Sequence, residues 1–396
     1  PPPPPPLFTP TRRNPRFGFK SRGLGDVYKR QGELDKPAAS DLAPPPGYIW
    51  RVPEGFPLPR VPADNPMTSE KVELGRLLFY DPRLSGDSTI SCATCHQPEH
   101  AFTDGREQAV GIGGSIHPRS AMSLTNVAYN STLGWDDPKL TRLEDQILVP
   151  LYNTDPPEMG VTGHDNEVLA RFRKDPRMVH HFRTAFPEDP SPIIMRNIIY
   201  ALASFERTLI SGNSTYDRWA YGGKAEGLDE VQRAGARLFF SKRLACFRCH
   251  GGFNFSGPVQ YEGSESPEAR FHNTGLYDED GQGAYPEPNT GLHRHTGESF
   301  DMGKFRAPTL RNIALTAPYM HDGSIPDLDA VLDHYGVGGR HRLHRPQEDN
   351  IAVESITDPL MTGFELSEDE TRQLIAFLHA LTDETFVQES KQSAVP

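Results

Sequence analysis

The chain has 396 residues, of which 36% are hydrophobic, 38 are proline and 35 are glycine. This composition indicates up to two domains of ordinary size with much of the chain in loops. A formal net charge of −12 without basic runs argues against nucleic acid and anionic membranes as partners, and no stretch of 18 or more apolar residues could form a transmembrane segment.

The first 46 residues have a different character from the rest. They begin with six prolines and continue through a basic stretch, so they cannot bury enough apolar surface to offset the entropy of ordering. We expect residues 1–46 to be disordered, or to be an artefact unrelated to the rest of the chain, and the ordered chain to begin near Tyr48.

Two similar helices are predicted, one in each half of the chain. The first is capped by Thr68 or Ser69 and ends at Asp81, before a proline, and the second opens at Leu228-Asp229. Their apolar positions are Val72, Leu74, Leu77 and Leu78 in the first helix and Val231, Ala234, Leu238 and Phe239 in the second. Both contain G-x-x-L-F, at 75–79 and 235–239, which indicates an internal duplication.

The remaining pattern is also helical. Periodic apolar residues predict helices over 167–173, 193–210, 328–335 and 367–381. The segment 251–304 is rich in Gly, Pro, Asn and His and contains no long helix. We therefore expect a mainly α protein of two related domains with long loops, over residues 47–215 and 216–390.

The four cysteines form two C-x-x-C-H motifs, consisting of Cys92, Cys95 and His96 and of Cys246, Cys249 and His250. Two thiols one helical turn apart followed by an imidazole suit two thioether bonds and one axial bond to a c-type haem. A disulfide, a thioredoxin-like redox pair or half of a zinc site would each leave the histidine unexplained. We therefore predict two covalently bound c-type haems. Since such haems are attached on the oxidising side of the bacterial inner membrane, we expect a periplasmic protein.

The sixth position of each haem iron decides between electron transfer and chemistry, because an open position admits peroxide. Spacing alone does not choose among the candidate ligands, which are His100, His117, Met159, His293, His295, Met302, Met320, His321, His334 and Tyr335.

Further segments add to the two motifs, namely Ala101-Phe-Thr-Asp-Gly105, Phe305-Arg-Ala-Pro-Thr-Leu-Arg-Asn-Ile313 and Ala317-Pro-Tyr-Met-His-Asp-Gly323. With them the chain resembles the bacterial di-haem cytochrome c peroxidase and MauG superfamily over residues 47–382. Within it the chain is most similar to the MbnH-like enzymes of methanobactin-type operons. The segments that carry this closer likeness are 65–67, 117–119, 271–277 and 291–292.

The resemblance implies a peroxide-reactive first haem, with His96 as its proximal ligand and Gln146, Pro150 and Glu158 on its distal side. A carboxylate such as Glu158 can take the proton from the near oxygen of peroxide and return it to the leaving one. The resemblance also places Trp135 between the two haems, as a station for the oxidising equivalent.

The second haem is implied to be six-coordinate, with Tyr335 as its sixth ligand. A phenolate is a hard anionic donor that stabilises high-valent iron. Met320 and His334 remain alternatives. His117 is close to the place where related peroxidases carry a histidine that blocks the first iron. It either ligates there, so that reductive activation is needed, or faces solvent, which we favour.

The family further implies a calcium ion between the haems, held by the Asn126 side chain and the carbonyls of Arg306 and Pro308, which is the oxygen ligation that calcium prefers. The expected activity is formation of a bis-high-valent haem state with hydrogen peroxide, followed by long-range oxidation of a partner protein. The closer likeness suggests conversion of a tryptophan to kynurenine on a copper-binding partner. The alternatives are a cytochrome c peroxidase fed by a small cytochrome c or cupredoxin, and an electron-transfer protein without catalysis.

Overall fold

A computed structural model describes residues 48–222, 227–265, 268–340 and 356–394, and the predicted disordered segment lies outside these ranges. The described chain is mostly helical, and within it no helix is long and apolar enough to cross a membrane. The α-helices are α2 (Ser69–Phe79), α3 (Cys92–Cys95), α4 (Leu143–Tyr152), α5 (Asp165–Arg173), α6 (Pro176–Ala185), α7 (Met195–Glu206), α8 (Thr215–Ala220), α9 (Glu230–Phe239), α10 (His293–Thr296), α11 (Leu328–Gly336), α13 (Glu368–His379) and α14 (Glu384–Ser393).

Short elements occupy the loops between these helices. The 3-10 helices are η2 (Pro82–Leu84), η3 (Pro98–His100), η4 (Ile112–Gly114), η5 (Val127–Tyr129), η6 (Cys246–Arg248), η7 (Ser299–Asp301) and η8 (Ile313–Leu315). Two three-residue strands, β1 (Phe271–Asn273) and β2 (Lys304–Arg306), pair antiparallel with Phe271 opposite Arg306.

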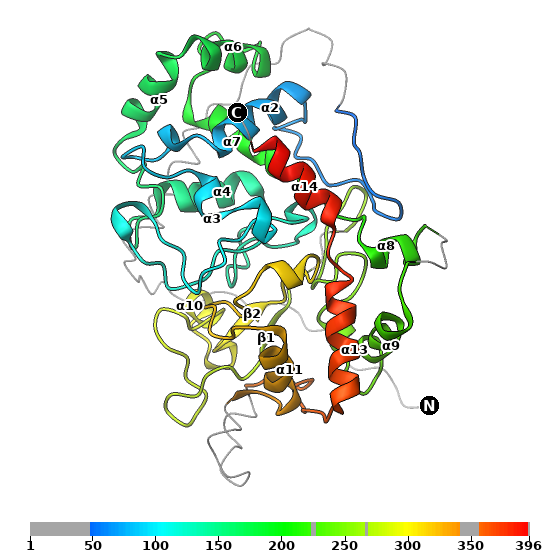
Figure 1. The fold of residues 1–396 in the computed structure, drawn as a ribbon. Coiled ribbons are helices and arrows are strands. Elements are labelled where there is room, and N and C mark those ends of the chain that lie inside the picture. The colour runs from blue at the N-terminus through cyan, green and yellow to red at the C-terminus, as the bar shows by residue number, and fades with distance from the viewer. Residues whose placement is uncertain (1–47, 223–226, 266–267, 341–355, 395–396) are drawn as a thin grey trace, which may run out of the picture.

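The buried apolar residues form two separate clusters, one in each half of the molecule (Figure 1). The first is built mainly from α2, α4, α5, α6 and α7, and its buried residues run from Leu74 to Leu209, with Phe386 and Val387 added from α14. The second is built around α9, α11 and α13 and runs from Leu228 to Leu381. The division between the clusters therefore falls close to the predicted boundary at 215–216.

Each cluster is organised by one close pair of helices, and a glycine makes each pair possible. A Cβ atom on Gly75 of α2 would lie 2.0 Å from the carbonyl oxygen of Ala201 in α7, and one on Gly235 of α9 would lie 1.9 Å from that of Gln373 in α13. The next neighbour is a phenylalanine Cβ in both pairs, from Phe205 and from Phe377. The G-x-x-L-F helices thus make the same contact in the two halves.

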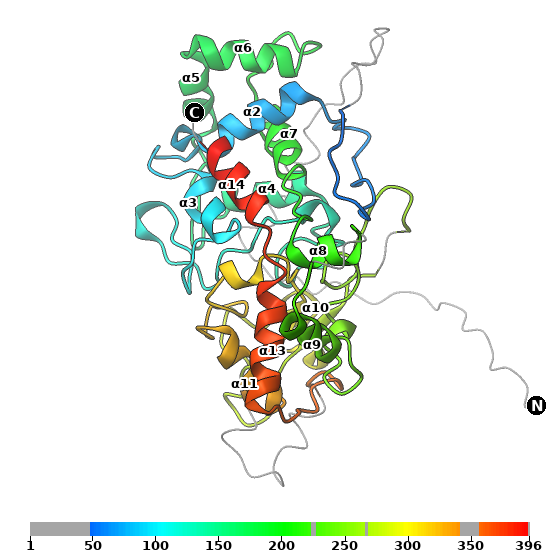
Figure 2. The ribbon, with the colours of Figure 1, turned by 45° about the vertical axis from the view of Figure 1, so that its right-hand side comes forward.

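The last helix crosses between the halves. Figures 1 and 2 show α14 beside the elements of the first half, whereas α13, which precedes it, lies in the second. Phe386 and Val387 of α14 are part of the first cluster, and the Phe386 ring contacts the Phe102 ring at 5.8 Å. The predicted second domain ran to residue 390, but the chain returns to the first half from Glu384 onward.

The predicted helices near 69, 230, 328 and 368 are confirmed, with Thr68, Asp229 and Ser367 as side-chain caps. The helix predicted over 193–210 is shorter and runs from Met195 to Glu206. Six α-helices of the described ranges were not predicted, namely α3, α4, α6, α8, α10 and α14. Val231, one of the apolar positions named for α9, is exposed.

We predict that Gly75→Ala and Gly235→Ala each destabilise the holoprotein by about 1–3 kcal/mol or more, because the methyl group overlaps a backbone oxygen that cannot rotate away. Denaturant unfolding of the haem-loaded protein measures the change. Gly257→Ala is the control, since its Cβ would be 4.0 Å from the nearest atom. Wild-type stability in either helix variant would contradict this helix-pair geometry.

Candidate functional site

The first C-x-x-C-H motif forms a single helical turn, α3, followed by His96. His96 Nδ1 lies 2.9 Å from the carbonyl oxygen of Phe102, so it donates its proton there and leaves Nε2 with a free lone pair. That carbonyl is brought back by two consecutive left-handed residues, Ala101 (φ 48°) and Phe102 (φ 63°). Ser123 Oγ donates to the Ala101 carbonyl at 2.6 Å. The segment 101–105 therefore orients the imidazole.

The second motif repeats this arrangement with different parts. Cys246 opens η6, and His250 Nδ1 lies 3.1 Å from the carbonyl oxygen of Pro308. Burial lowers the pKa of His250 to about 4 and also lowers that of His96. Both imidazoles are therefore neutral at pH 7, with Nε2 available to an iron.

The segment that carries Pro308 is anchored by a buried ion pair. Arg311, which is 1% exposed, pairs with Asp217 through both terminal nitrogens at 2.8 and 2.9 Å. Thr309 Oγ1 donates to the Asn254 carbonyl. These contacts position the Pro308 carbonyl beneath the motif.

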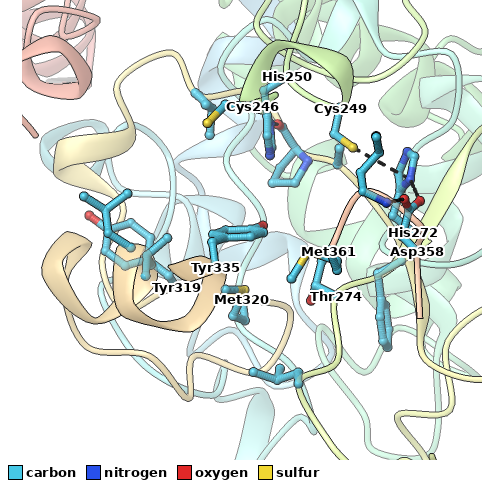
Figure 3. Close-up of a pocket in the computed structure, with 18 of the residues that line it drawn as sticks. Cys246, Cys249, His250, His272, Thr274, Tyr319, Met320, Tyr335, Asp358 and Met361 are labelled. Carbon is cyan, nitrogen blue, oxygen red and sulfur yellow. Dashed lines mark hydrogen bonds and ion pairs between the residues drawn. The ribbon is translucent and has the colours of Figure 1, made fainter. Parts of the chain in front are cut away.

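A largely apolar cavity adjoins the second motif and fits a covalently bound haem (Figure 3). Cys246, Cys249 and His250 line it together with side chains of α9, α11 and α13. Three of the candidate sixth ligands also line it, namely Met320, His321 and Tyr335. His334 is buried beside Tyr335 on α11 but does not line the cavity.

Tyr335 and His250 enter this cavity from different elements. In the view of Figure 3 the Tyr335 ring lies between His250 and Met320. Burial raises the pKa of the Tyr335 hydroxyl, so the phenol is protonated unless a cation such as iron stabilises the anion. His321 is stacked on the Phe305 ring, with centroids 3.8 Å apart and ring planes 13° apart.

Arg306 supplies the cavity with a buried positive charge. Its guanidinium donates to the Gly134 carbonyl at 3.2 Å, and burial lowers its pKa to about 10. Among the residues that the structure describes, no carboxylate forms an ion pair with it. A haem propionate is the anion that this position suits.

The residues predicted on the distal side of the first haem come from α4 and the loop after it. Gln146 and Pro150 are one helical turn apart and share a face of α4, and the Pro150 carbonyl accepts the Met159 N–H at 2.8 Å. Cys95 Sγ lies 3.9 Å from the Val110 carbonyl oxygen, and a Cβ atom on the next residue, Gly111, would lie 2.9 Å from the Cα atom of Glu158. The segment of Glu158 is therefore close to the first motif.

His117 has a partner that the sequence did not indicate. Its Nε2 lies 3.3 Å from Glu158 Oε1, and both side chains are partly exposed. The two expected positions of His117 were on the iron or in solvent, and this contact with Glu158 was not among the expectations.

Trp135 is held at both its backbone and its indole. Its carbonyl accepts the Arg306 N–H at 2.8 Å, and its Nε1 donates to the Ser120 carbonyl at 3.4 Å. The residues next to these two contacts, Asp136 and Arg119, form a buried ion pair at 2.6 and 2.7 Å. Trp135 lines the cavity that adjoins the second motif. The ion pair was not predicted, because its partners are 17 residues apart in loops.

The predicted calcium-binding residues are occupied by protein contacts. Asn126 Oδ1 accepts the Ser211 N–H at 2.7 Å, and Asn126 Nδ2 donates to Ser211 and Asn254. The Pro308 carbonyl accepts from His250. Within the described ranges, no group of three or more His, Cys, Asp or Glu side chains is arranged for a bare metal ion.

Comparison with known proteins agrees with this geometry. The family described as "Di-haem cytochrome c peroxidase" matches residues 69–225. The methylamine utilization protein MauG of Methylorubrum extorquens is 36% identical over 85% of this chain and 84% of its own length. The chain belongs to the di-haem cytochrome c peroxidase and MauG family. It is therefore a peroxidase-type oxidoreductase, and the family carries two c-type haems.

Other relatives differ in their described roles. Cytochrome c peroxidase Ccp of Escherichia coli is 34% identical over 82% of this chain and 61% of its own length. A crystal structure of a MauG-like protein associated with microbial copper homeostasis is 45% identical, with a TM-score of 0.82 over 86% of this chain and 97% of that one. The diheme peroxidase BthA of Burkholderia thailandensis, at 20% identity and a TM-score of 0.61, shares the fold.

We predict that Asp136→Asn destabilises the holoprotein by about 3–5 kcal/mol, because it leaves the Arg119 guanidinium buried without its counter-charge. Burial raises the pKa of Asp136, but His295 and Arg119 outweigh it, so that the pKa lies well below its usual value. The pair therefore stabilises the fold above about pH 4 and loses this contribution as the pH falls.

Denaturant unfolding of wild type and variant across this acid range measures the effect. Glu230→Gln, which breaks the exposed pair with Arg237, is the control and should cost under about 1 kcal/mol. An Asp136→Asn variant that is no less stable than this control would contradict the assigned role of the ion pair.

Proposed function

We propose that the chain is a periplasmic di-haem oxidase that uses hydrogen peroxide to oxidise a tryptophan of a partner protein by long-range electron transfer. The observation that carries the proposal is the difference between two otherwise similar haem sites. The segment of Glu158, an acid that can move protons, packs beside the first motif through Gly111 and Val110, whereas Tyr335 lines the cavity of the second.

Bound haem supplies the redox-active iron that reacts with peroxide and exchanges electrons. In this proposal Glu158 accepts the proton of the near peroxide oxygen and returns it to the far one, which leaves as water. Gln146 and Pro150, on one face of α4, bound the distal space. His96, held by the Phe102 carbonyl, is the proximal ligand.

We assign the sixth position of the second haem to Tyr335, with Met320 as the alternative that also lines the cavity. A closed iron at this site favours storage of an oxidising equivalent over binding of peroxide. Trp135, fixed by Ser120 and Arg306, is proposed as the electron-transfer station between the haems.

The substrate class is inferred from the relatives. A MauG-like relative of 45% identity is associated with copper homeostasis, which favours a copper-binding partner protein whose tryptophan is converted to kynurenine. The net charge of −12 would attract a basic partner. It would equally attract a small basic electron donor, so peroxide reduction with electrons from a cytochrome c or cupredoxin is the second candidate.

Two structural inferences belong to the proposal. We propose that residues 47–215 and 216–383 are cytochrome c-like domains that arose by duplication, supported by the equivalent contacts of Gly75 and Gly235. We also propose a calcium ion at Asn126 Oδ1 and the carbonyls of Arg306 and Pro308. A carbonyl oxygen that accepts one hydrogen bond keeps a second lone pair for a cation.

We expect the ferric protein to give one high-spin and one low-spin EPR signal, both of which disappear when stoichiometric peroxide is added. Glu158→Gln should slow this reaction by about 100-fold or more, since an amide cannot accept the proton. Asp155→Asn, which changes an exposed carboxylate of the same segment, is the control. Two low-spin haems that ignore peroxide would instead indicate an electron-transfer protein.

Trp135→Phe separates the two catalytic candidates. If the substrate is a partner protein, the variant should still react with peroxide at the first haem but fail to modify the co-encoded partner, as followed by mass spectrometry. Fast turnover with reduced cytochrome c by the wild type, without any modified partner, would contradict the leading proposal and support the second candidate.

A further inference from the structure

His117 occupies a loop that is closed on itself and against the segment of Glu158. Val110 and Ile116 form a β-bridge, and the Gly111 N–H donates to the Ser115 carbonyl at 2.7 Å. The Ile112 N–H donates to the Glu158 carbonyl at 2.9 Å. The loop and the Glu158 backbone therefore form one unit.

The backbone of this loop packs closely against the segment 157–160. A Cβ atom on Gly111 would lie 2.2 Å from the Pro157 carbonyl oxygen, and one on Gly160 would lie 2.0 Å from the Ile112 side chain. His117 is thus presented to Glu158 by a loop that glycines allow to lie directly against it. For the backbone at His117 to move away from Glu158, the Val110–Ile116 bridge and the Ile112 hydrogen bond would have to open.

The His117 and Glu158 side chains are both partly exposed to solvent, and their contact is close to the first haem motif. His117 is 25% exposed and Glu158 is 31% exposed, and the charge of Glu158 acts on both Cys95 and His96. The other charged groups acting on Cys95 are Asp104 and Arg106, from the segment between the motif and the loop. Among the described residues, His117 is the one that forms an ion pair with Glu158.

We propose that His117 is the positioning residue of Glu158, a role that rests on the proposed function of that carboxylate. His117 Nε2, 3.3 Å from Oε1, restricts the glutamate side chain by an electrostatic contact and leaves the other carboxylate oxygen for proton transfer. A carboxylate fixed before the reaction avoids the entropy cost of ordering it during proton transfer. Because the same nitrogen is engaged by Glu158, it is not a ligand of the first iron in this arrangement, and the enzyme is ready without reductive activation.

The test uses cyanide, because hydrogen cyanide must lose its proton to a distal base when it binds ferric haem, and no oxidation is involved. Stopped-flow association rates are measured on the ferric holoprotein between about pH 5 and pH 8, where histidine titrates. His117→Phe should slow binding about 10-fold, less than Glu158→Gln. His117→Gln should restore the rate near pH 8, since its amide can donate to Oε1.

His164→Gln is the matched control, because His164 pairs with Glu167 on the exposed surface, and its cyanide association rates should equal those of the wild type over the whole pH range. Rates equal to wild type in His117→Phe would overturn the proposal.

A second readout does not depend on either haem reaction. An NMR spectrum of the holoprotein labelled at histidine Cε1, recorded at one fixed pH, should show that Glu158→Gln moves the His117 resonance, and an unmoved resonance would overturn the pairing. If the pairing and the cyanide effects hold but no partner protein is oxidised, the proposed function fails and the positioning role stands. If the partner protein is oxidised but His117→Phe behaves as wild type, the proposed function stands and the positioning role of His117 fails.

Discussion

Each motif histidine donates its Nδ1 proton to a backbone carbonyl, and much of the surrounding chain serves to place those two carbonyls. An imidazole that binds iron through Nε2 needs a fixed tautomer and ring orientation, which the protein supplies from the other nitrogen. At the first site the Phe102 carbonyl is reached through consecutive left-handed residues, a conformation that costs about 1–3 kcal/mol for each non-glycine residue. At the second site the carbonyl belongs to Pro308, held by the buried Arg311–Asp217 pair.

The two motifs have similar supports but different neighbours. The helix pairs and the contacts of the motif histidines are equivalent in the two halves. Tyr335 of α11 lines the cavity of the second motif, and Glu158 lies in the loop after α4 of the first half, so the proposed difference in reactivity depends on these two side chains. Relatives named as peroxidases and as MauG proteins share the scaffold, and a few side chains on these loops are where their reactions can diverge.

Local signals in the sequence identified the haem motifs and the helices that begin with strong caps. Thr68, Asp229 and Ser367 each cap a helix as expected, because capping depends on neighbouring residues alone. Helix α4 was missed because Pro150 interrupts its pattern, and α14 was missed because only Phe386 and Val387 are buried.

Local sequence patterns of this kind could not predict contacts between segments that are distant in the chain. His117 and Glu158 are 41 positions apart, and each follows a loop whose path depends on the packing of Gly111 and Gly160. The Arg119–Asp136 pair likewise joins two loops without periodicity. Spacing along the chain cannot show where such loops meet, whereas the family resemblance could suggest Glu158 because it transfers a three-dimensional arrangement.

The halves are joined by buried polar contacts, and this has a consequence for electron transfer. Asp383, which is 2% exposed, accepts hydrogen bonds from Ser211, Gly212 and Asn213, and α14 continues into the first core. Asn126 links Ser211 to Asn254 of the second half. Each of these groups would be left unpaired and buried if the halves moved apart, at about 1–3 kcal/mol for each group.

Because electron transfer falls steeply with distance, two haems can share one oxidising equivalent only if the separation between them stays constant. Trp135 meets the same requirement locally, since its backbone is tied to Arg306 of the second half and its indole to Ser120 of the first. In the proposed function, a rigid junction of this kind would let the substrate remain outside the molecule. No substrate pocket beside the first haem would be needed, because the oxidised residue of the partner would have to approach only the surface.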